Sequence, residues 1–513
     1  EDIDKRTLED LRPKDRTSLR LVVWTSVVSK VRTLASGKRF PDPEERINHP
    51  AHRRIVSHSP LQPAAESEGS PDLLARDDLR EYILQLNRFP GRRVDAAVSS
   101  AESAGHVNLD YIVSENRPWL AYAQISNTGT EATDEWRERI GLLCNQLLNA
   151  DDTLTLDYIT AGYGADANAL AFSYDFAVLP VDGLRLRVFA SWSDFEARDI
   201  GAAEEFFTGE GWSAGAEGIY TVFQHNELFV DLMAGARWQY ARDTNETFAP
   251  TVVIEGESDF FLPYAGVRAS RRLETSETAA VLMVETNLAD VADTDEEALE
   301  RLGRLQTDED WVSLRWDLSH SFFLDPLLLG GAKPDEHQLR HELALHFHGQ
   351  YVFDDKRLVP HFEKTAGGFH TVRGYEESIV AGDNGDIGTA EYRLHVDRLI
   401  RFKPERKPVL GNRVFGNHFR FAPEAPGGET DWGLILRAFF DIAETDHNEA
   451  LTSEVGQTLA SWGVGLELQV LKKLNVRCDW GFVLNDVEMY DGEPMEDAET
   501  GDSRVHLSAT LIW

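Results

Sequence analysis

Arg373 is the residue whose type and surroundings most clearly predict a specific interaction. It lies in Val372-Arg373-Gly374-Tyr375, inside a long polar segment, residues 355–385, that ends with the turn-forming motif Gly382-Asp383-Asn384-Gly385. A guanidinium presents its N–H donors as a planar fork that can hold one carboxylate through two parallel hydrogen bonds. If the segment folds back into a cavity, a buried arginine needs an acidic partner there. We therefore predict an ion pair at Arg373 and no catalytic residue.

A candidate acidic partner lies in residues 434–443, where apolar and polar residues alternate. The apolar positions are Leu434, Leu436, Ala438, Phe440 and Ile442. Asp441 therefore points to the opposite face of the predicted strand, where it could meet Arg373. Glu391, in the alternating stretch 389–396, faces the same way and is the second choice. The alternative is an arginine that stays hydrated on an outer loop.

Two patterns resemble enzyme motifs but lie in the wrong context. Gly211-Trp212-Ser213-Ala214-Gly215 fits G-x-S-x-G, yet it lies in a strand pattern without the helix that follows a nucleophile elbow. His341, Glu342 and His346 miss the H-E-x-x-H spacing by one residue, and in a strand the two histidines face opposite ways. His346 and His348 share a face and could bind a metal weakly, although polar side chains lining a cavity are the favoured interpretation. We predict no metal site and no cofactor.

An alternation of apolar and polar residues predicts the elements that position these groups. It runs from Trp119 to Trp513, and in residues 228–240 the even positions are apolar while Asp231 and Arg237 occupy odd ones. A soluble β-sandwich also alternates. Long strands, both signs of charge on the polar faces, and Trp and Tyr near the strand ends favour a transmembrane β-barrel.

We predict an all-β barrel of about 16 antiparallel strands, an even number as in most membrane barrels. Tight turns such as Gln224-His225-Asn226 alternate with longer acidic loops. The last predicted strand, residues 505–513, must pair with the first so that no edge is left open. Trp513 ends this strand with an aromatic residue at the membrane interface, where it could serve as an assembly signal.

Composition limits the remaining possibilities. The chain has 513 residues, a mean hydropathy of -0.36 and no run of about 18 apolar residues, which argues against a helical membrane bundle. The formal charge of -37 disfavours a nucleic-acid partner. Acidic residues gather in 290–310 and 486–502, which we interpret as solvated loops, with divalent-cation binding as the alternative. Cys144 and Cys478 lie on different predicted strands, so no disulfide is expected.

A different pattern precedes the barrel. Residues 11–55 hold eleven Lys and Arg against four Asp and Glu, in contrast to the acidic remainder. We divide the chain into a charged segment at 1–18, a small α+β domain at 19–115 and the barrel at 116–513. The predicted elements of the small domain are a strand at 19–28, a helix at 72–87 and strands at 93–98 and 106–113.

These motifs resemble those of the two-partner secretion transporters (TpsB type) of the BamA-like superfamily. Val372-Arg373-Gly374-Tyr375 matches the superfamily's VRGY/F signature, which lies in the sixth extracellular loop inside the barrel lumen. The other likenesses are a POTRA helix at residues 84–94, its junction with the barrel at 115–118 and 126–130, and the strand motif at 381–385 and 391–393. The resemblance covers residues 72–513.

The resemblance implies an outer-membrane translocase, not an enzyme, with the POTRA-like domain in the periplasm of a Gram-negative-type cell. Its partners would be a large β-helical exoprotein, outer-membrane lipids and the barrel assembly machinery. In the family the loop arginine pairs with the aspartate that Asp441 matches. The alternatives are an insertase for other barrels and a passive porin-like barrel.

The chain departs from the family in two ways. Ala443 stands where the wall motif of the family has glycine. The sequence has room for one POTRA domain where the family usually has two and a plug helix, of which Lys5–Arg12 could be a remnant. Since Glu1 begins a charged stretch, we expect a mature or trimmed chain.

Overall fold

The computed structural model divides the chain into two units, residues 1–116 and residues 117–513, and each is described by itself. The predicted charged segment 1–18, with the helical spacing at Lys5–Arg12, lies outside the described residues. These are 25–42, 44–63, 72–162, 166–178, 181–200, 205–248, 251–328, 339–400, 402–403, 413–425, 428, 430–452, 454–489, 492–495 and 498–513.

The N-terminal unit contains the predicted small sheet, with helices packed against it. Strand β3 lies between β1 and β2, parallel to β1 and antiparallel to β2. Val94 and Leu109 of the sheet share a buried core with Leu79 and Leu86 of the main helix. The elements are β1 (Val27–Ser36), η1 (Pro50–His52), α1 (Arg53–Ser57), α2 (Arg76–Asn87), β2 (Arg92–Ser100) and β3 (His106–Glu115).

Strand β1 begins later than the sequence predicts. The alternation predicts a strand at Leu19–Val28, part of which lies outside the described residues, whereas the observed strand is Val27–Ser36. The register of β1 against β3 shifts between Val28 and Lys30. Because one extra residue reverses the facing of all the residues after it, the alternation that marks a strand changes phase there.

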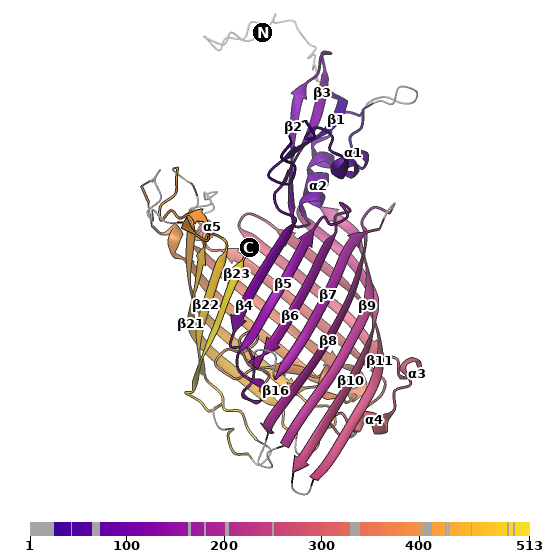
Figure 1. Ribbon diagram of the computed structural model, residues 1–513, viewed down its shortest axis with the longest axis vertical. Helices are drawn as coiled ribbons and strands as arrows, with labels where there is room; N and C mark the ends of the chain where they lie inside the picture. The colour runs from indigo at the N-terminus through magenta and orange to yellow at the C-terminus, as the bar shows by residue number, and fades with distance from the viewer. Residues whose placement is uncertain are drawn as a thin grey trace, which may run out of the picture. The chain divides into compact units, whose positions relative to one another are not determined.

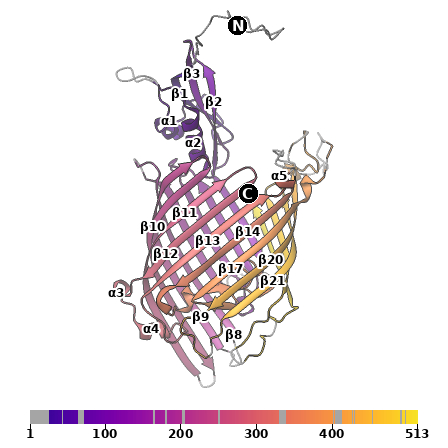
Figure 2. The same cartoon turned by 180° about the vertical axis from the view of Figure 1, so that it is seen from behind.

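The second unit is a closed barrel of 16 strands in which neighbours along the chain pair antiparallel, as predicted. The last strand, β23, pairs with the first, β4, and leaves no open edge. Figures 1 and 2 show its two sides. The barrel strands are β4 (Trp119–Ser126), β5 (Arg137–Asn145), β6 (Thr153–Ala161), β7 (Ala167–Ala177), β8 (Leu184–Ile200), β9 (Glu205–His225), β10 (Leu228–Phe248), β11 (Thr251–Arg272), β12 (Ser276–Asn287), β13 (Trp311–Phe323), β14 (His341–Val352), β17 (Asn384–His395), β20 (Trp432–Asp446), β21 (Gln457–Val470), β22 (Leu474–Val483) and β23 (Ser503–Ile512).

The two faces of the barrel wall differ as the alternation predicts. In β20 the apolar residues Leu436, Phe440 and Ile442 are 43 to 46% exposed and point outward, whereas Asp441 between them is fully buried. The same contrast separates exposed Leu232 from buried Asp231 in β10. An apolar outer face and a charged interior are the arrangement of a transmembrane barrel.

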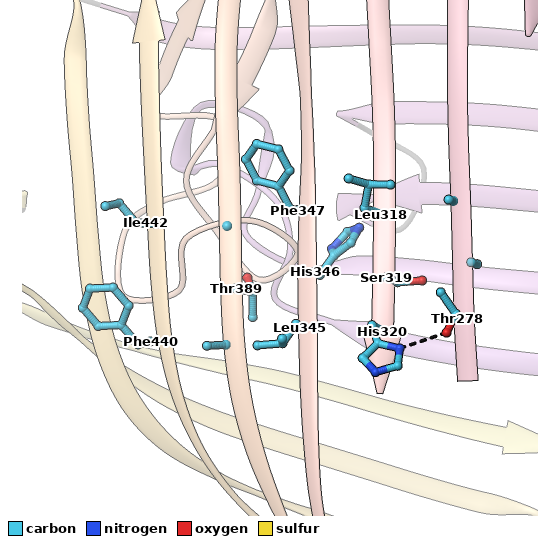
Figure 3. Close-up of a pocket in the computed structure, with 14 residues that line it drawn as sticks. Thr278, Leu318, Ser319, His320, Leu345, His346, Phe347, Thr389, Phe440 and Ile442 are labelled. Carbon is cyan, nitrogen blue, oxygen red and sulfur yellow. Dashed lines mark hydrogen bonds between the residues drawn. The ribbon is translucent and has the colours of Figure 1, made fainter. Parts of the chain in front are cut away.

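The outer face has a shallow apolar depression of about 420 Å³ where β12, β13, β14, β17 and β20 run side by side. Small residues, among them Ala280, Gly388 and Ala390, form its floor. Exposed Leu318 and Phe347 flank it, and in Figure 3 their side chains lie around the pocket. The outward-facing part of this lining is apolar except for His320 and Thr278, which are hydrogen-bonded at 2.9 Å.

The connections follow the predicted pattern of short turns and long loops only in part. A two-residue turn with left-handed Asn226 joins β9 to β10, one residue later than predicted. Long loops follow β12, β14, β20 and β22, but the turns after β13 and β17 are long as well. The elements in these connections are η2 (Glu131–Thr133), α3 (Ala289–Ala292), α4 (Glu296–Glu300), α5 (Asp325–Leu328), η7 (Val396–Arg398), β18 (Arg413–Val414) and β19 (Asn417–His418).

Residues 353–383, between β14 and β17, form the loop that the sequence predicts at 355–385. Because β17 begins at Asn384, the predicted loop residues Asn384 and Gly385 belong to the strand. The loop forms an antiparallel ribbon of its own. Its elements are η5 (Phe353–Asp355), η6 (Pro360–Phe362), β15 (Lys364–Ala366) and β16 (Val380–Gly382).

Among the described residues, no helix combines the length and the apolar character needed to cross a membrane. Cys144 and Cys478 are both free thiols, so the expectation of no disulfide is confirmed for this pair.

Candidate functional site

Arg373 is buried inside the barrel, and its guanidinium contacts three acidic residues of the wall. Its Nε and Nη2 donate to the two carboxylate oxygens of Asp441 at 2.8 and 2.9 Å. Its Nη1 donates to Glu391 at 2.6 Å and to Asp479 at 3.0 Å. The expected contact with Asp441 is therefore present in the predicted fork geometry, and Glu391 is a second partner rather than a substitute.

The charge state of Arg373 follows from this environment. Burial alone would lower its pKa, but the hydrogen bonds and charge of Asp441, with the charges of Glu391 and Asp479, raise the pKa above its ordinary value. The guanidinium therefore stays protonated at any physiological pH. Its positive charge is balanced by carboxylates on β17, β20 and β22, so one loop residue joins three strands of the wall.

Two aromatic contacts fix the loop tip further. The guanidinium carbon of Arg373 lies 3.4 Å from the ring centre of Phe439, which points inward from the same strand as Asp441. Arg477 of β22 lies in the same way 4.4 Å from the ring centre of Phe369 in the loop. Cation–π contacts of this kind are stronger in sites that water does not reach.

The loop backbone approaches the wall closely at Gly374. This residue has φ of +103°, a conformation that favours glycine, and its N–H donates to Nε2 of His506 on β23 at 3.0 Å. A Cβ at the facing Gly481 would lie 2.5 Å from the Gly374 nitrogen. Glycine is therefore needed at both positions for the backbones to meet.

Val372 and Tyr375, the outer residues of the motif, are fully buried. The Tyr375 hydroxyl lies 3.0 and 2.7 Å from the backbone oxygens of Ala460 and Asn485 and can donate its one proton to either of them. Burial raises the pKa of this phenol, so it remains a donor. Together with the contacts of Arg373 and Gly374, all four motif residues hold the loop against the wall between β17 and β23.

The second predicted motif contributes mainly through Asp383. This carboxylate is fully buried and accepts hydrogen bonds from both Nη atoms of Arg304 at 2.7 and 2.9 Å. Asn384 donates to the side chain of Asn448 at 2.8 Å. At the neighbouring Gly382, a Cβ would lie 2.7 Å from the backbone oxygen of Asp446, so the chain passes close to β20.

The other predicted positions have plain structural surroundings. Trp513 is 56% exposed. Its backbone N–H donates to the backbone oxygen of Ala121 at 2.9 Å, next to the pairing of β23 with β4 that closes the barrel. Its role as an assembly signal stays a prediction. The G-x-S-x-G match lies within β9, a strand, as its pattern predicts.

Two groups of side chains inside the barrel could be considered for a metal. The rings of His346 and His348 lie stacked with centres 4.7 Å apart, but Lys364 already donates to His348 at 2.9 Å. Glu363, Asp383 and His447 also lie close together. The Arg304 guanidinium contacts all three, as described below, and therefore takes the place that a cation would fill.

A polar cavity of about 400 Å³ lies beside the loop tip inside the barrel. Its lining includes acidic and basic side chains, with Asp317 and Glu391 on one hand and Arg393 and Arg477 on the other. The cavity therefore presents both signs of charge to the interior of the barrel.

Sequence reasoning missed several residues that hold the loop. Asp479 and His506 follow the alternation of their strands and could have been found by the test that found Asp441. Arg304, Arg357 and Glu454 lie in loops without any periodicity. For these three residues the sequence offers no comparable signal.

Comparisons with known proteins support this architecture. CdiB from Escherichia coli superposes with a TM-score of 0.66 at 13% identity, covering 94% of this chain and 76% of CdiB. BamA from Haemophilus ducreyi lacking POTRA domains 1–3 superposes with a TM-score of 0.51 at 11% identity, covering 94% of this chain and 85% of that one.

In sequence, the heme/hemopexin transporter protein HuxB of Haemophilus influenzae is 24% identical over 140 residues. The match covers 26% of this chain, and it spans about a quarter of HuxB, 24% of its length. No family model matches the sequence. The expected fold is thus confirmed, and the chain shares its architecture with CdiB and BamA.

Proposed function

We propose that this chain is an outer-membrane translocase that exports a secreted partner protein, as in two-partner secretion. The observation that carries the proposal is the loop 353–383, which lies inside the barrel and is attached to the wall through the buried Arg373. Such an attachment makes the interior a passage that can be closed, rather than a permanently open pore. The fold shared with CdiB and the sequence similarity to HuxB, a heme/hemopexin transporter protein, support a transport function.

The geometry suggests how the passage would work. The loop is held by ion pairs and hydrogen bonds, which water and polar groups of an entering chain can replace step by step. At the loop tip, Val372 and Tyr375 share a buried apolar core with Leu459 and Val483 of the wall, and apolar side chains of a client could replace these contacts. An extended client could therefore displace the tip while the wall strands stay paired.

The N-terminal unit offers a surface for recognising an extended client. Strand β2 lies at one edge of the sheet and, among the described residues, pairs only with β3. At the other edge, β1 is bridged at Leu34 by Ile47 and at Val27 by Leu73. We propose that β2 accepts an extended segment by strand addition in the periplasm, where backbone hydrogen bonds would supply the affinity. The client is then a large exoprotein of β-helical type, which folds outside the cell.

The proposed transport uses no nucleotide, and the proposed activity is transport rather than catalysis. The outer-membrane lipids contact the apolar outer face, and the barrel assembly machinery inserts the chain during biogenesis. The runner-up is an insertase for other barrels, which the fold shared with BamA supports. A passive porin-like barrel is the third candidate.

The test is secretion of a candidate exoprotein encoded beside this chain, in an outer-membrane host with and without the chain. We expect the exoprotein in the medium only when the chain is present. Retention of the exoprotein in the periplasm in both strains, with a correctly folded barrel, would contradict the proposal.

Two controls separate the alternatives. The insertase function predicts that loss of the chain lowers the amounts of other outer-membrane barrels, measured by heat-modifiable mobility. The porin-like function predicts an ion conductance that does not change when residues 366–383 are deleted. Translocation predicts neither result.

A further inference from the structure

A second group of buried charges lies in the long loops, apart from the Arg373 site. It contains Arg304 from the loop between β12 and β13, Arg357 and Asp383 from the loop 353–383, and Glu454 from the loop between β20 and β21. We name these four residues the outer clamp. Arg304 is 8% exposed, Arg357 1% and Asp383 fully buried.

Arg304 uses its whole guanidinium within this group. Its Nη1 and Nη2 hold the two oxygens of Asp383 at 2.7 and 2.9 Å, and its Nε donates to Glu454 at 2.8 Å. Nη1 also reaches the carboxylate of Glu363 at 2.9 Å and the backbone oxygen of Leu358 at 2.8 Å. One arginine thus connects three different loops.

Arg357 makes six hydrogen bonds, four of them to backbone oxygens. Its Nη1 and Nη2 each donate to Glu454 at 2.8 Å. The four backbone acceptors, at 2.9 to 3.1 Å, are Leu305, Gln306, Asn448 and Glu449. These acceptors come from the loops before β13 and after β20, so Arg357 fastens the start of its own loop to both neighbours.

Glu454 is shared by both arginines and is the centre of the group. Burial alone would raise its pKa, but the hydrogen bonds from Arg357 and Arg304 lower it to about 2. It also accepts the N–H of Leu451 at 2.9 Å, which folds its own loop around the carboxylate. Removing this one carboxylate would leave two buried guanidinium groups without their common partner.

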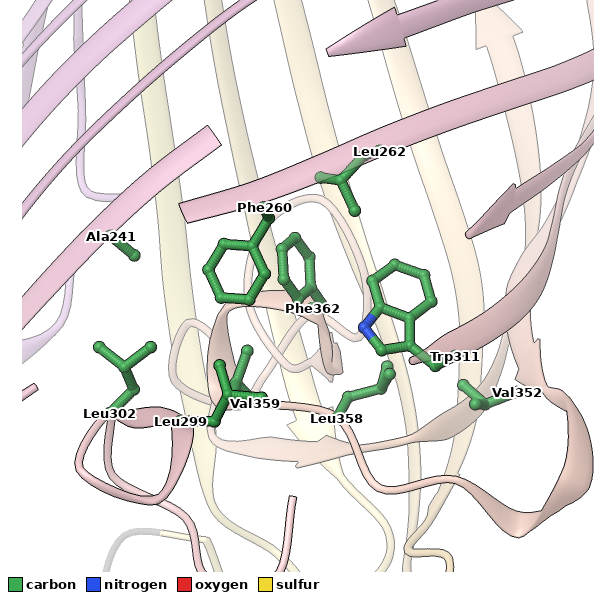
Figure 4. Packing of buried hydrophobic residues seen from close by; sticks show 10 residues of the cluster. All are labelled: Ala241, Phe260, Leu262, Leu299, Leu302, Trp311, Val352, Leu358, Val359 and Phe362. Carbon is green, nitrogen blue, oxygen red and sulfur yellow. The ribbon is translucent and has the colours of Figure 1, made fainter. Parts of the chain in front are cut away.

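An apolar core joins two of the same loops to the barrel wall. It combines Phe260 and Leu262 of β11 and Trp311 of β13 with side chains from the two loops, as Figure 4 shows. The loop members of this core are Leu299, Leu302, Leu358, Val359 and Phe362. At Gly256 of β11 a Cβ would lie 2.5 Å from the backbone of Arg301, so loop and wall are in direct backbone contact.

A metal site is the alternative use of these residues, since Glu363, Asp383 and His447 could coordinate a cation. Arg304 contacts the two carboxylates directly, and its Nη2 lies 3.2 Å from Nδ1 of the histidine. A divalent ion there would have to displace a guanidinium that is already fully bonded. The geometry therefore favours an ion-pair group and not a metal centre.

The two ends of the loop 353–383 are both held by this group, because Arg357 lies near its start and Asp383 is its last residue. We propose that the outer clamp is a second attachment, which keeps both ends of the loop 353–383 across the passage and opens independently of the Arg373 site. This inference rests on the proposed translocation. It adds that the loop 353–383 has two separate attachments, one at its tip and one at its two ends.

The test measures ion conductance of the purified full chain in planar lipid bilayers, which needs no client. We expect Glu454→Gln to raise the open probability at least about tenfold, because a carboxamide cannot compensate two buried guanidinium charges. Arg304→Lys is the second variant, which keeps the charge but loses the fork, and a smaller rise is expected. Heat-modifiable mobility must show that each variant still forms the barrel.

The matched control is Glu297→Gln, which removes a 77% exposed carboxylate from the loop that carries Arg304 and should leave the conductance of the wild type unchanged. Unchanged conductance in both Glu454→Gln and Arg304→Lys, with folded barrels, would overturn the outer clamp. That result would leave export itself intact if the exoprotein is still secreted. Conversely, higher conductance without any secretion by the wild type would support the outer clamp and refute the export function.

Discussion

The Arg373 site and the outer clamp both compensate buried guanidinium charge, but their acceptors come from different parts of the chain. In both, buried guanidinium groups are balanced by carboxylates. Arg373 takes all three of its carboxylates from barrel strands, namely Asp441, Glu391 and Asp479. The outer clamp is built from loop residues alone, and it relies on backbone oxygens as much as on side chains.

The difference teaches which part of the passage is preformed. The wall carboxylates around Arg373 are fixed by strand pairing whether or not the loop is docked, so they form a receptor into which the loop inserts one charge. The outer clamp exists only when three loops are folded together. We therefore expect the loop tip to dock as a unit, and the three loops of the outer clamp to become ordered together.

The largest effect is expected from Arg373→Met. This change removes the guanidinium bonded to Asp441, whereas Glu391 keeps Arg393 and Asp479 keeps Arg477 as partners. Breaking this buried ion pair should cost about 3–5 kcal/mol of folding free energy. The measurement is the temperature at which the barrel loses its heat-modifiable mobility. Unaltered stability and secretion would show that the contacts of Arg373 are incidental.

A smaller loss is expected from Arg357→Lys. Lysine keeps the charge but cannot supply the six hydrogen bonds that the arginine makes, and the unsatisfied acceptors should cost about 1–3 kcal/mol. Amide hydrogen exchange should accelerate in residues 447–456, while residues 368–374 at the loop tip serve as the internal reference. Equal acceleration in both places would mean that the two attachments are one cooperative unit.

The alternation of residues explains why the sequence predicts one of these groups and not the other. Strand period places every second residue on one face, so the pattern of residue types alone assigns Asp441 and Glu391 to the interior. Asp479 obeys the same rule. The closed barrel and the location of its last strand follow from the same pattern.

The loops lack such a rule, and the predictions there were weaker. Arg304, Arg357 and Glu454 are brought together from positions up to 150 residues apart by the folding of the barrel. Strand ends shift for a similar reason: β1 contains a register change, and the loop at 353–383 gives two residues to β17. Connection lengths at the two ends of the barrel are also set by tertiary packing, so the predicted asymmetry is confirmed only in part.

A pH change should have opposite effects on the contributions of Glu377, in the loop near Arg373, and of Glu454, in the outer clamp. Burial raises the pKa of Glu377, near the loop tip, to about 7, although the N–H of Phe369 and the charges of Arg504 and Arg137 lower it. The folded loop therefore takes up a proton before the unfolded chain does, whose glutamates titrate near ~4.3. Stability from this group rises as pH falls from about 7 toward ~4.3.

Glu454 has the opposite sign. Its pKa of about 2 lies below the unfolded value, so its contribution is complete above ~4.3 and is lost as pH falls toward 2. Between pH 8 and pH 6, hydrogen exchange corrected for its intrinsic rate should slow at Gly368 and Phe369 and stay constant in residues 447–456. Glu377→Gln should abolish the change at the tip. A pH response that persists in this variant would assign it to another group.

The smallest effect is expected from Arg272→Gln at the turn between β11 and β12. Arg272 pairs with Glu277, but the two side chains are 79% and 53% exposed. Water solvates both charges in the folded and the unfolded chain, so the pair should contribute less than about 1 kcal/mol, and salt should reduce this further. The same thermal transition measures it beside Arg373→Met. If the exposed pair proved as costly to remove as the buried one, burial would not be what distinguishes the arginines of the passage from those of the surface, and the roles assigned to both buried groups would lose their physical basis.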